Sequence, residues 1–553
     1  MAEEVDALAR ILGLPSLVSV CIHYYSLTYL YIDSNEELAA LRHLFTWEHK
    51  RFIDWKSHAA LGVSDNKPEL GIDVAVEELT IACLENMSAA FQEVQTPSRV
   101  SKPLSRAAMG GPVATPLNYN PSRRKTVWAI QGPRNAEALC RQLKSYNDML
   151  DVVWRRSRAT VARSLLPELD GFDSIDGLRR IEDSLTWLHD GQYQDLAISA
   201  RFRRLCLQHQ PDERPPIAPT HWDDLRLLDQ AQRMKHCNFP QEFFCGRLHR
   251  ARLGDKDVLL EWKELPISLT MSTKFNGPDY EKLIDANIKE LASILGAVSK
   301  PPDLKALSCV GSYQLQTIGS PKRVCFAFEP PSGSPAEPVS LQDLMEGHQL
   351  RRCGILRLGD KFVLAQGLAS SVYQLLFAGW PHMGIRSSNV YFLKPLSGET
   401  AWRAEAKSFR LMGYQLTRSM DHIHGSFETE LDIEPRRYLS PQYIERQQQG
   451  TFVHYKSHHD IYSLGIVLIE IALWQTARQL AQALGLHSAA SLEAFQISAM
   501  EVLLPQVEER MGMVYADAVR FCLQGETEGP TDLPRLLKRF NRRVVSKLER
   551  CSA

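Results

Sequence analysis

A long uncharged segment near the start of the chain limits what this protein can fold into. Residues 11–32 (ILGLPSLVSVCIHYYSLTYLYI) contain no Asp, Glu, Lys or Arg. About 20 mostly apolar residues can form a helix that crosses a bilayer, so this segment must be covered by protein or by lipid. Pro15 and His23 interrupt its apolar character, and the usual basic flanks are missing. We therefore expect a helix buried in a bundle.

The alternative is a helix that is buried at rest and inserts into a membrane on activation. Its length and its position near the start of the chain favour this interpretation over an ordinary loop. The apolar side chains that would enter the lipid are Leu12, Leu14, Leu17, Val20 and Ile22.

Composition restricts the class of protein. A length of 553 residues exceeds what one hydrophobic core usually supports, so we expect more than one domain. The net charge of -1 gives no overall attraction to nucleic acid. The 11 cysteines include no C-x-x-C pair, which favours reduced thiols over disulfides or a zinc site. The acidic start, MAEEVD, is unlike a secretory signal, so a cytoplasmic protein is expected.

The first 200 residues show helical periodicity and no strand pattern. Apolar residues recur at steps of three, four and seven, which is typical of amphipathic helices packed in an all-α bundle. The stripes are Leu38, Leu41, Phe45, Phe52 and Trp55; Ile72, Val76, Leu79, Cys83 and Met87; Leu139, Leu143, Tyr146, Leu150 and Val153; and Leu178, Ile181, Leu185 and Leu188. Between them, residues 96–124 are rich in Pro, Gly and Ser and are predicted to form a basic loop, either solvated or facing anionic lipid.

Two stretches of this half resemble the HeLo domain of fungal incompatibility proteins, also called the prion-inhibition and propagation domain. They are residues 13–63, which contain RFIDWKSHAALGV, and KTVWAIQGPRNAEALCRQLKSYNDMLDVVW at 125–154. The resemblance covers about residues 5–200, with Trp55 and Trp128 as its anchors. It implies a helical bundle whose first segment can be expelled into membranes and cause cell death. The chain lacks the amyloid-forming motif of that family, so prion propagation is not implied.

Beyond about residue 243, short apolar runs alternate with helical segments, which indicates an α+β domain. Five motifs stand out in this half. They are VLLEWK at Val258–Lys263, HMGIRSSN at His382–Asn389, LMG at Leu411–Gly413, and SPQ at Ser440–Gln442 followed by HHDIYSLGIVLIEI at His458–Ile471. The helix expected after Lys263 offers Glu281, Asp285 and Glu290 as ion-pair partners, and the sequence does not choose among them.

The order of these motifs resembles that of a protein kinase. The resemblance implies that Lys263 and Asn389 lie in a nucleotide pocket. It also implies that His382, Pro441, Asp460 and Gly465 are structural landmarks. The cluster His458-His459-Asp460 is therefore interpreted as the start of a structural helix and not as a metal site.

Two replacements argue against catalysis. Gly384 stands where kinases carry the catalytic Asp, and Leu411 stands where they carry the metal-binding Asp. Mg²⁺ binds through oxygen, which neither side chain offers. The segment FFCGRLHRARLGDKDV before Lys263 also lacks a G-x-G-x-x-G loop. We expect a pseudokinase that is not an enzyme and has no metal or cofactor, with weak residual ATP binding through Lys263 and Asn389 as the only exception.

The predicted organisation is a HeLo helical bundle at 1–207, a linker at 208–240 and a two-lobed kinase-like domain at 241–553. The predicted function is that of a fungal signalling or cell-death effector, in which the kinase-like domain regulates a membrane-targeting bundle. The alternatives are an active atypical Ser/Thr kinase localised by its HeLo domain, and a non-enzymatic adaptor. Expected partners are membrane lipid on activation, further copies of the chain and an unidentified activating protein, with no nucleic acid. Activation would move the cytoplasmic protein to the plasma membrane.

Overall fold

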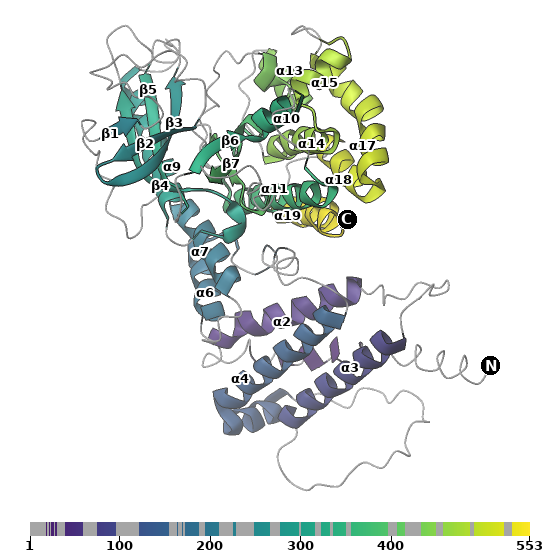
Figure 1. Ribbon diagram of the computed structural model, residues 1–553. Coiled ribbons are helices and arrows are strands. Elements are labelled where there is room, and N and C mark those ends of the chain that lie inside the picture. Colours follow the sequence, from purple (N-terminus) through teal and green to yellow (C-terminus); the bar gives the residue numbers. More distant parts are fainter. Residues whose placement is uncertain are drawn as a thin grey trace, which may run out of the picture. The chain divides into compact units, whose positions relative to one another are not determined.

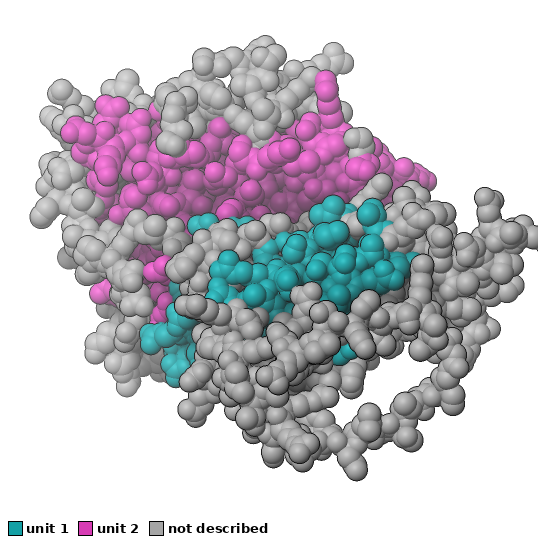
Figure 2. Space-filling view, turned by 90° about the horizontal axis from the view of Figure 1, so that it is seen from below, with its two compact units in different colours: residues 1–197 teal, residues 198–553 magenta. Residues whose placement is uncertain are grey.

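The chain divides into two compact units, residues 1–197 and 198–553 (Figures 1 and 2). The computed structural model describes residues 39–58, 74–95, 121–153, 172–186, 194–208, 225–227, 248–265, 277–297, 300–315, 322–331, 336–349, 356–395, 406–414, 433–448, 457–486, 492–524 and 533–552, together with single positions between 18 and 32 and between 163 and 169. The division falls inside helix α7 (Gln194–Gln208).

The described part of the first unit is helical, as the sequence predicts. Its long helices are α2 (Ala39–His58), α3 (Val74–Gln95), α4 (Pro121–Val153) and α6 (Ile175–Thr186). The predicted stripes are largely buried: Phe45, Phe52 and Trp55 of α2 lie in the core. Leu79 is an exception, with 51% of its surface exposed. Among the described side chains of α3, the buried ones begin at Thr80, one residue further along, and continue at the helical spacing through Cys83.

The uncharged segment near the start is helical at its described positions and buries one face. Val18, Cys21, Tyr25, Thr28 and Ile32 are buried, and their spacing of three and four residues places them on one face of a helix. This agrees with the expectation of a bundle helix.

The positions proposed to enter lipid are only partly described. Ile22 is half-buried. Leu12, Leu14, Leu17 and Val20 lie outside the described residues. Within the part of the chain that the structure describes, no single helix is both long and apolar enough to cross a membrane. One bent pair, His458–Leu473 with Ala477–Ala483, meets the criteria of length and composition when the two helices are taken together.

Helix α4 begins earlier than the sequence suggests. Residues 121–124 were expected to belong to the basic loop, but Pro121 is the first residue of the helix, a position that proline favours because its missing N–H is not needed there. Residues 96–120 lie outside the described part of the chain. The motif Lys125–Ile130 is helical, and the side chain of Trp128 is not among those described.

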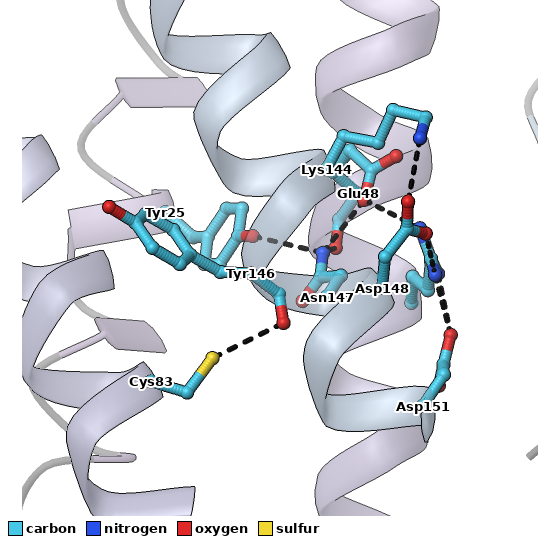
Figure 3. A network of polar contacts seen from close by, with 9 residues as sticks. Tyr25, Glu48, Cys83, Lys144, Tyr146, Asn147, Asp148 and Asp151 are labelled. Carbon is cyan, nitrogen blue, oxygen red and sulfur yellow. Dashed lines mark hydrogen bonds and ion pairs between the residues drawn. The ribbon is translucent and has the colours of Figure 1, made fainter. Parts of the chain in front are cut away.

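A buried polar network joins the first segment, α2 and α4 (Figure 3). The Arg51 guanidinium donates to Asp151 Oδ2 at 2.6 Å and to Asp148 Oδ1 at 2.5 Å, and it lies 3.3 Å from Glu48 Oε2. Asn147 donates through Nδ2 to Glu48 Oε2 at 2.8 Å and to the Tyr25 hydroxyl at 3.3 Å. Charge pairs and hydrogen bonds therefore connect three segments that are far apart in sequence.

The second unit begins with an antiparallel sheet of five strands, in the order β1-β2-β3-β5-β4. The strands are β1 (Leu225–Leu227), β2 (Leu248–Leu253), β3 (Lys256–Leu265), β4 (Ser308–Leu315) and β5 (Lys322–Glu329). Helix α9 (Gly277–Gly296) lies between β3 and β4 in sequence and packs on β4. Alternate residues Val258, Leu260 and Trp262 of β3 share one core cluster, as the two-residue period of a strand requires. The expected linker 208–240 contains the last residue of α7, Gln208, and strand β1, and its other residues are not described.

The rest of the second unit is mostly helical (Figure 1). A small sheet, β6-β7-β8, is formed by β6 (Ala336–Ser340), β7 (Val390–Pro395) and β8 (Arg410–Leu411). The α-helices described in this part of the unit are α10 (Leu341–Gln349), α11 (Leu358–Ala378), α12 (Ile433–Arg436), α13 (Pro441–Gln448), α14 (Ser457–Leu473), α15 (Ala477–Ala483), α16 (Leu492–Ser498), α17 (Leu504–Met511), α18 (Met513–Gln524), α19 (Leu533–Phe540) and α20 (Ser546–Glu549). Two π-helical turns lie at Ala499–Leu503 and Asn541–Val545. Helix α14 is buried along almost its whole length. The mixture of sheet and helix agrees with the α+β prediction.

Candidate functional site

The loop His382–Asn389 connects the end of α11 to β7 and is held by Asp460. The Asp460 carboxylate accepts the backbone N–H of His382 at 2.5 Å and that of Met383 at 2.9 Å. Asp460 is fully buried in the first turn of α14. Met383 has a φ of 60°, a conformation that a non-glycine residue adopts only when its surroundings enforce it. Asp460 thus positions the loop and is not aimed at a ligand.

His382 is a neutral, structural residue at the start of this loop. It is fully buried, and its Nδ1 accepts the N–H of Gly384 at 3.2 Å. Burial, followed by the positive charges of Lys263 and Arg386, lowers the pKa of His382 to about 3. The ring packs against Tyr414 with centroids 4.4 Å apart. His382 therefore stays uncharged across the physiological range.

Asn389 binds its own loop. Its Nδ2 donates to the Gly384 carbonyl at 2.6 Å, and its backbone carbonyl accepts the N–H of Met412 at 2.8 Å. Gly413 follows with a φ of 81°, and a Cβ atom built there would lie 2.1 Å from Asn389 Nδ2. Only glycine fits at this position without displacing Asn389. The Asn389 amide, which the kinase resemblance places in a nucleotide pocket, thus forms a hydrogen bond within its own loop.

Lys263 forms an ion pair within its own strand. Its Nζ lies 2.6 Å from Glu261 Oε1, and both side chains are largely buried. The other oxygen of Glu261 accepts the N–H of Gly413 at 3.3 Å. Residues two apart on a strand share a face, so the spacing within VLLEWK was the signal for this partner, which sequence reasoning missed.

The sequence offered three acidic residues on the helix after β3 as partners of Lys263. Asp285 and Glu290 are half-exposed on α9, and the side chain of Glu281 lies outside those described. The ion pair found at Lys263 is the one with Glu261. The charge of the lysine is therefore balanced from within its own strand.

Gly384 and Leu411, which the kinase resemblance pairs with carboxylates, offer no side-chain oxygen. Leu411 is fully buried in β8, and its N–H donates to the Lys305 carbonyl at 3.0 Å. Gly384 is half-buried and contributes only backbone atoms. Among the described residues, no group of three or more His, Cys, Asp or Glu side chains is arranged to hold a metal ion. These residues do not fit the magnesium that phosphoryl transfer requires.

The sequence did not single out Glu470, a buried acid at the centre of the helical part. Its Oε1 accepts hydrogen bonds from the Ser387 hydroxyl at 3.0 Å, the Tyr438 hydroxyl at 2.6 Å and the Ala477 N–H at 2.6 Å. Burial raises the pKa of Glu470 to about 7. A single acid inside the apolar run IVLIEI was the available signal, because such a group must find donors when the helix is buried.

The remaining landmarks shape the helical part. Pro441 is the first residue of α13. A Cβ atom at Gly465 would lie 2.9 Å from the Cβ of Cys522, so this glycine permits the close approach of α14 and α18. His459 makes a 2.5 Å contact between its Nδ1 and the Ser440 hydroxyl. Like His382 and Asp460, these residues contact other parts of the protein.

Comparison with known proteins gives a family model and similar solved structures. Residues 309–547, less than half of the chain, match a family model described as a domain of unknown function (DUF7580). Among solved structures, the autoinhibited serine kinase domain of the giant muscle protein titin is similar to 60% of this chain and 84% of that chain, with 13% sequence identity and a TM-score of 0.37. No curated protein has a sequence that matches this chain significantly.

Proposed function

We propose that the second unit is a protein-kinase-like domain that does not transfer phosphate, and that it regulates a helical unit acting at membranes. The kinase-like assignment is supported by the sheet order β1-β2-β3-β5-β4, with one helix between β3 and β4, followed by a mainly helical part. The motifs fall on this frame in the order that kinases use: Lys263 on the third strand, and His382–Asn389 directly before β7.

One observation carries the non-catalytic part of the proposal. The ammonium of Lys263 is bound by Glu261 at 2.6 Å, while Gly384 and Leu411 supply no carboxylate. Phosphoryl transfer depends on positioned charge and a bound metal ion. This disfavours an active atypical kinase and favours a domain that acts by binding other parts of a complex.

The experiment is a thermal unfolding measurement on the full chain with ATP, in the presence and absence of magnesium. A ligand at a hundred times its Kd stabilises a protein by about 2.7 kcal/mol. Because Lys263 is bound by Glu261, we also propose that magnesium-ATP does not bind, so it should leave the unfolding temperature of the wild type unchanged. A magnesium-dependent increase that disappears in Lys263→Met, but persists when exposed Lys407 is changed to Met, would contradict it.

The membrane-acting part rests on the uncharged first segment, and Ser26 offers a sharp test. Ser26 is exposed, so a lysine there leaves the buried face intact. In a bilayer, the same charge at mid-helix costs about 2.5–3.5 kcal/mol. We expect Ser26→Lys to reduce the leakage of vesicles made from phosphatidylcholine and phosphatidylserine. Ser145→Lys, at an exposed position of α4, should not. Equal leakage from both variants, or none from the wild type, would favour the adaptor interpretation.

A further inference from the structure

The last helical segment of the second unit has two contrasting faces. Helix α19, the turn Asn541–Val545 and α20 follow one another without a break. The buried positions of this segment are Leu536, Leu537, Phe540, Asn541, Val544, Val545 and Leu548. Every fully exposed position between 533 and 550 carries Arg or Lys: Arg535, Lys538, Arg539, Arg542, Arg543 and Arg550. We call these six residues the cationic stripe.

The spacing of the cationic stripe places its charges on one face. Among its first five members, each residue has another member three or four positions away, which is the spacing of neighbours along a helix surface. The chain as a whole has a net charge of -1, so this concentration is local. Residues 533–552 contain one acidic residue, the half-buried Glu549. Like charges this close repel one another, and a negatively charged surface would reduce that repulsion.

The one acidic residue of the neighbouring helix α18 forms ion pairs with cations outside the stripe. The Asp517 carboxylate on α18 is bound by Lys547 at 2.9 Å and by Arg520. Neither cation belongs to the stripe. Arg539 lies over the Phe521 ring, 5.9 Å from its centroid. These two contacts show that α18 runs antiparallel to the last segment, with Phe521 near residue 539 and Asp517 near residue 547.

Two exposed apolar residues lie at one end of the cationic stripe. Met513 is 65% exposed and Val514 is 41% exposed. They stand one helical turn before Asp517, and α18 is antiparallel, so they are beside the end of the chain that carries Arg550. A row of cations that ends in exposed apolar side chains is the pattern of surfaces that bind at a membrane interface.

We propose that the cationic stripe docks on the headgroups of an anionic membrane, with Met513 and Val514 entering the interface. The stripe from Arg535 to Arg550 is about 22 Å long at the helical rise, so it spans several headgroups. Nucleic acid is a poorer fit, because a phosphate backbone offers no apolar interface for the exposed side chains of Met513 and Val514. The inference depends only on residues 513–550 and goes beyond the membrane action proposed for the first unit.

The test is co-sedimentation of the full chain with vesicles of phosphatidylcholine alone or mixed equally with phosphatidylserine. The stripe variant changes Arg535, Arg542, Arg543 and Arg550 to Gln. The control variant removes the same charge from dispersed exposed positions of the same unit by changing Lys256, Arg357, Lys407 and Arg478 to Gln. The wild type should bind the mixed vesicles only. The partition coefficient should fall by about tenfold or more in the stripe variant, since each cation near an anionic surface adds to binding. In the control it should stay within about twofold of the wild type.

Several results would overturn the proposal. They are absence of wild-type binding to the mixed vesicles, equal losses in the stripe and control variants, and unchanged binding in the stripe variant. Displacement of the wild type from the vesicles by a short DNA duplex at equal phosphate concentration would assign the stripe to nucleic acid instead.

A second comparison keeps the test informative if the quadruple variant does not fold. Met513→Ser should weaken binding to the mixed vesicles several-fold. Ile497→Ser, at an exposed apolar position of α16 away from the stripe, should not. Equal binding of these two variants would contradict the predicted insertion of Met513 and would overturn the docking geometry.

Discussion

The two units use buried charge in opposite ways. In the helical unit, Arg51 keeps its full charge and is surrounded by Asp148, Asp151 and Glu48, which belong to α2 and α4. Around the loop His382–Asn389, two of the positions where a kinase would hold carboxylates are Gly384 and Leu411. Asp460 remains, but it binds backbone N–H groups. Buried charge thus joins separate helices in the first unit, whereas the buried ion pair of Lys263 and Glu261 near this loop stays within one strand.

The largest expected effect concerns the Arg51 network. Changing Arg51 to Met leaves Asp151 and Glu48 buried without their counter-charge, which should lower the free energy of unfolding of the helical unit by about 3–5 kcal/mol. Hydrogen exchange of α2 and α4 peptides in the full chain measures this. Arg141→Met is the control, because its ion pair with Glu137 is exposed and is worth at most about 1 kcal/mol. Similar protection in the two variants would show that the network does not hold the unit together.

The second prediction is a pH dependence centred on Glu470. Its folded pKa of about 7 lies above its unfolded value near 4.5, so the folded state binds the proton more tightly. The stabilisation by protonated Glu470 is complete below the unfolded pKa and is lost as the pH rises through 7. Relative to Glu470→Gln, the wild type should therefore lose roughly 2–3 kcal/mol between pH 5 and pH 8.

Denaturant unfolding at several pH values measures this difference. The Gln side chain keeps a carbonyl oxygen for the Ser387, Tyr438 and Ala477 donors, so the fold should survive. Glu493→Gln, at an exposed position of α16, should follow the wild type at every pH. Parallel curves for the wild type and Glu470→Gln would mean that Glu470 is charged in the folded protein.

Gly413 gives a smaller effect with a well-matched control. Gly413 and Gly485 both have positive φ, 81° and 73°, so alanine at either costs about 1–2 kcal/mol in backbone strain. A Cβ at Gly413 also meets Asn389, whereas nothing lies within 4 Å of a Cβ at Gly485. Chemical denaturation should show an excess loss of about 1–2 kcal/mol for Gly413→Ala. Equal losses would mean that Asn389 does not pack against the Leu411–Gly413 segment as described.

Local sequence patterns predicted where the helices lie, but not which segments contact each other. The stripe through Phe45, Phe52 and Trp55 located α2, because helical periodicity reflects which face is buried. The pairing of Arg51 with Asp151 was not predictable, because it depends on which helices are neighbours across 100 residues of sequence. Periodicity also assigned Leu79 to the core one residue away from the face that α3 actually buries.

The candidate site shows the same limit. Its missing carboxylates at Gly384 and Leu411 were read directly from the aligned motifs. The partner of Lys263 was sought on the following helix, because the kinase pattern places it there, while Glu261 on the same strand binds it. A close reading of the two-residue strand period would have found this acid. The donors that surround Glu470 come from three separate segments, so only the tertiary structure brings them together.

The central claim is that the kinase-like unit retains its framework without phosphotransfer. The most direct measurement is magnesium-dependent release or transfer of the ATP γ-phosphate by the purified full chain, compared with Lys263→Met. Since Gly384 and Leu411 provide no metal ligand or base and Lys263 is bound by Glu261, both proteins should give the same background rate. Turnover by the wild type that requires magnesium and is lost in Lys263→Met would contradict the account.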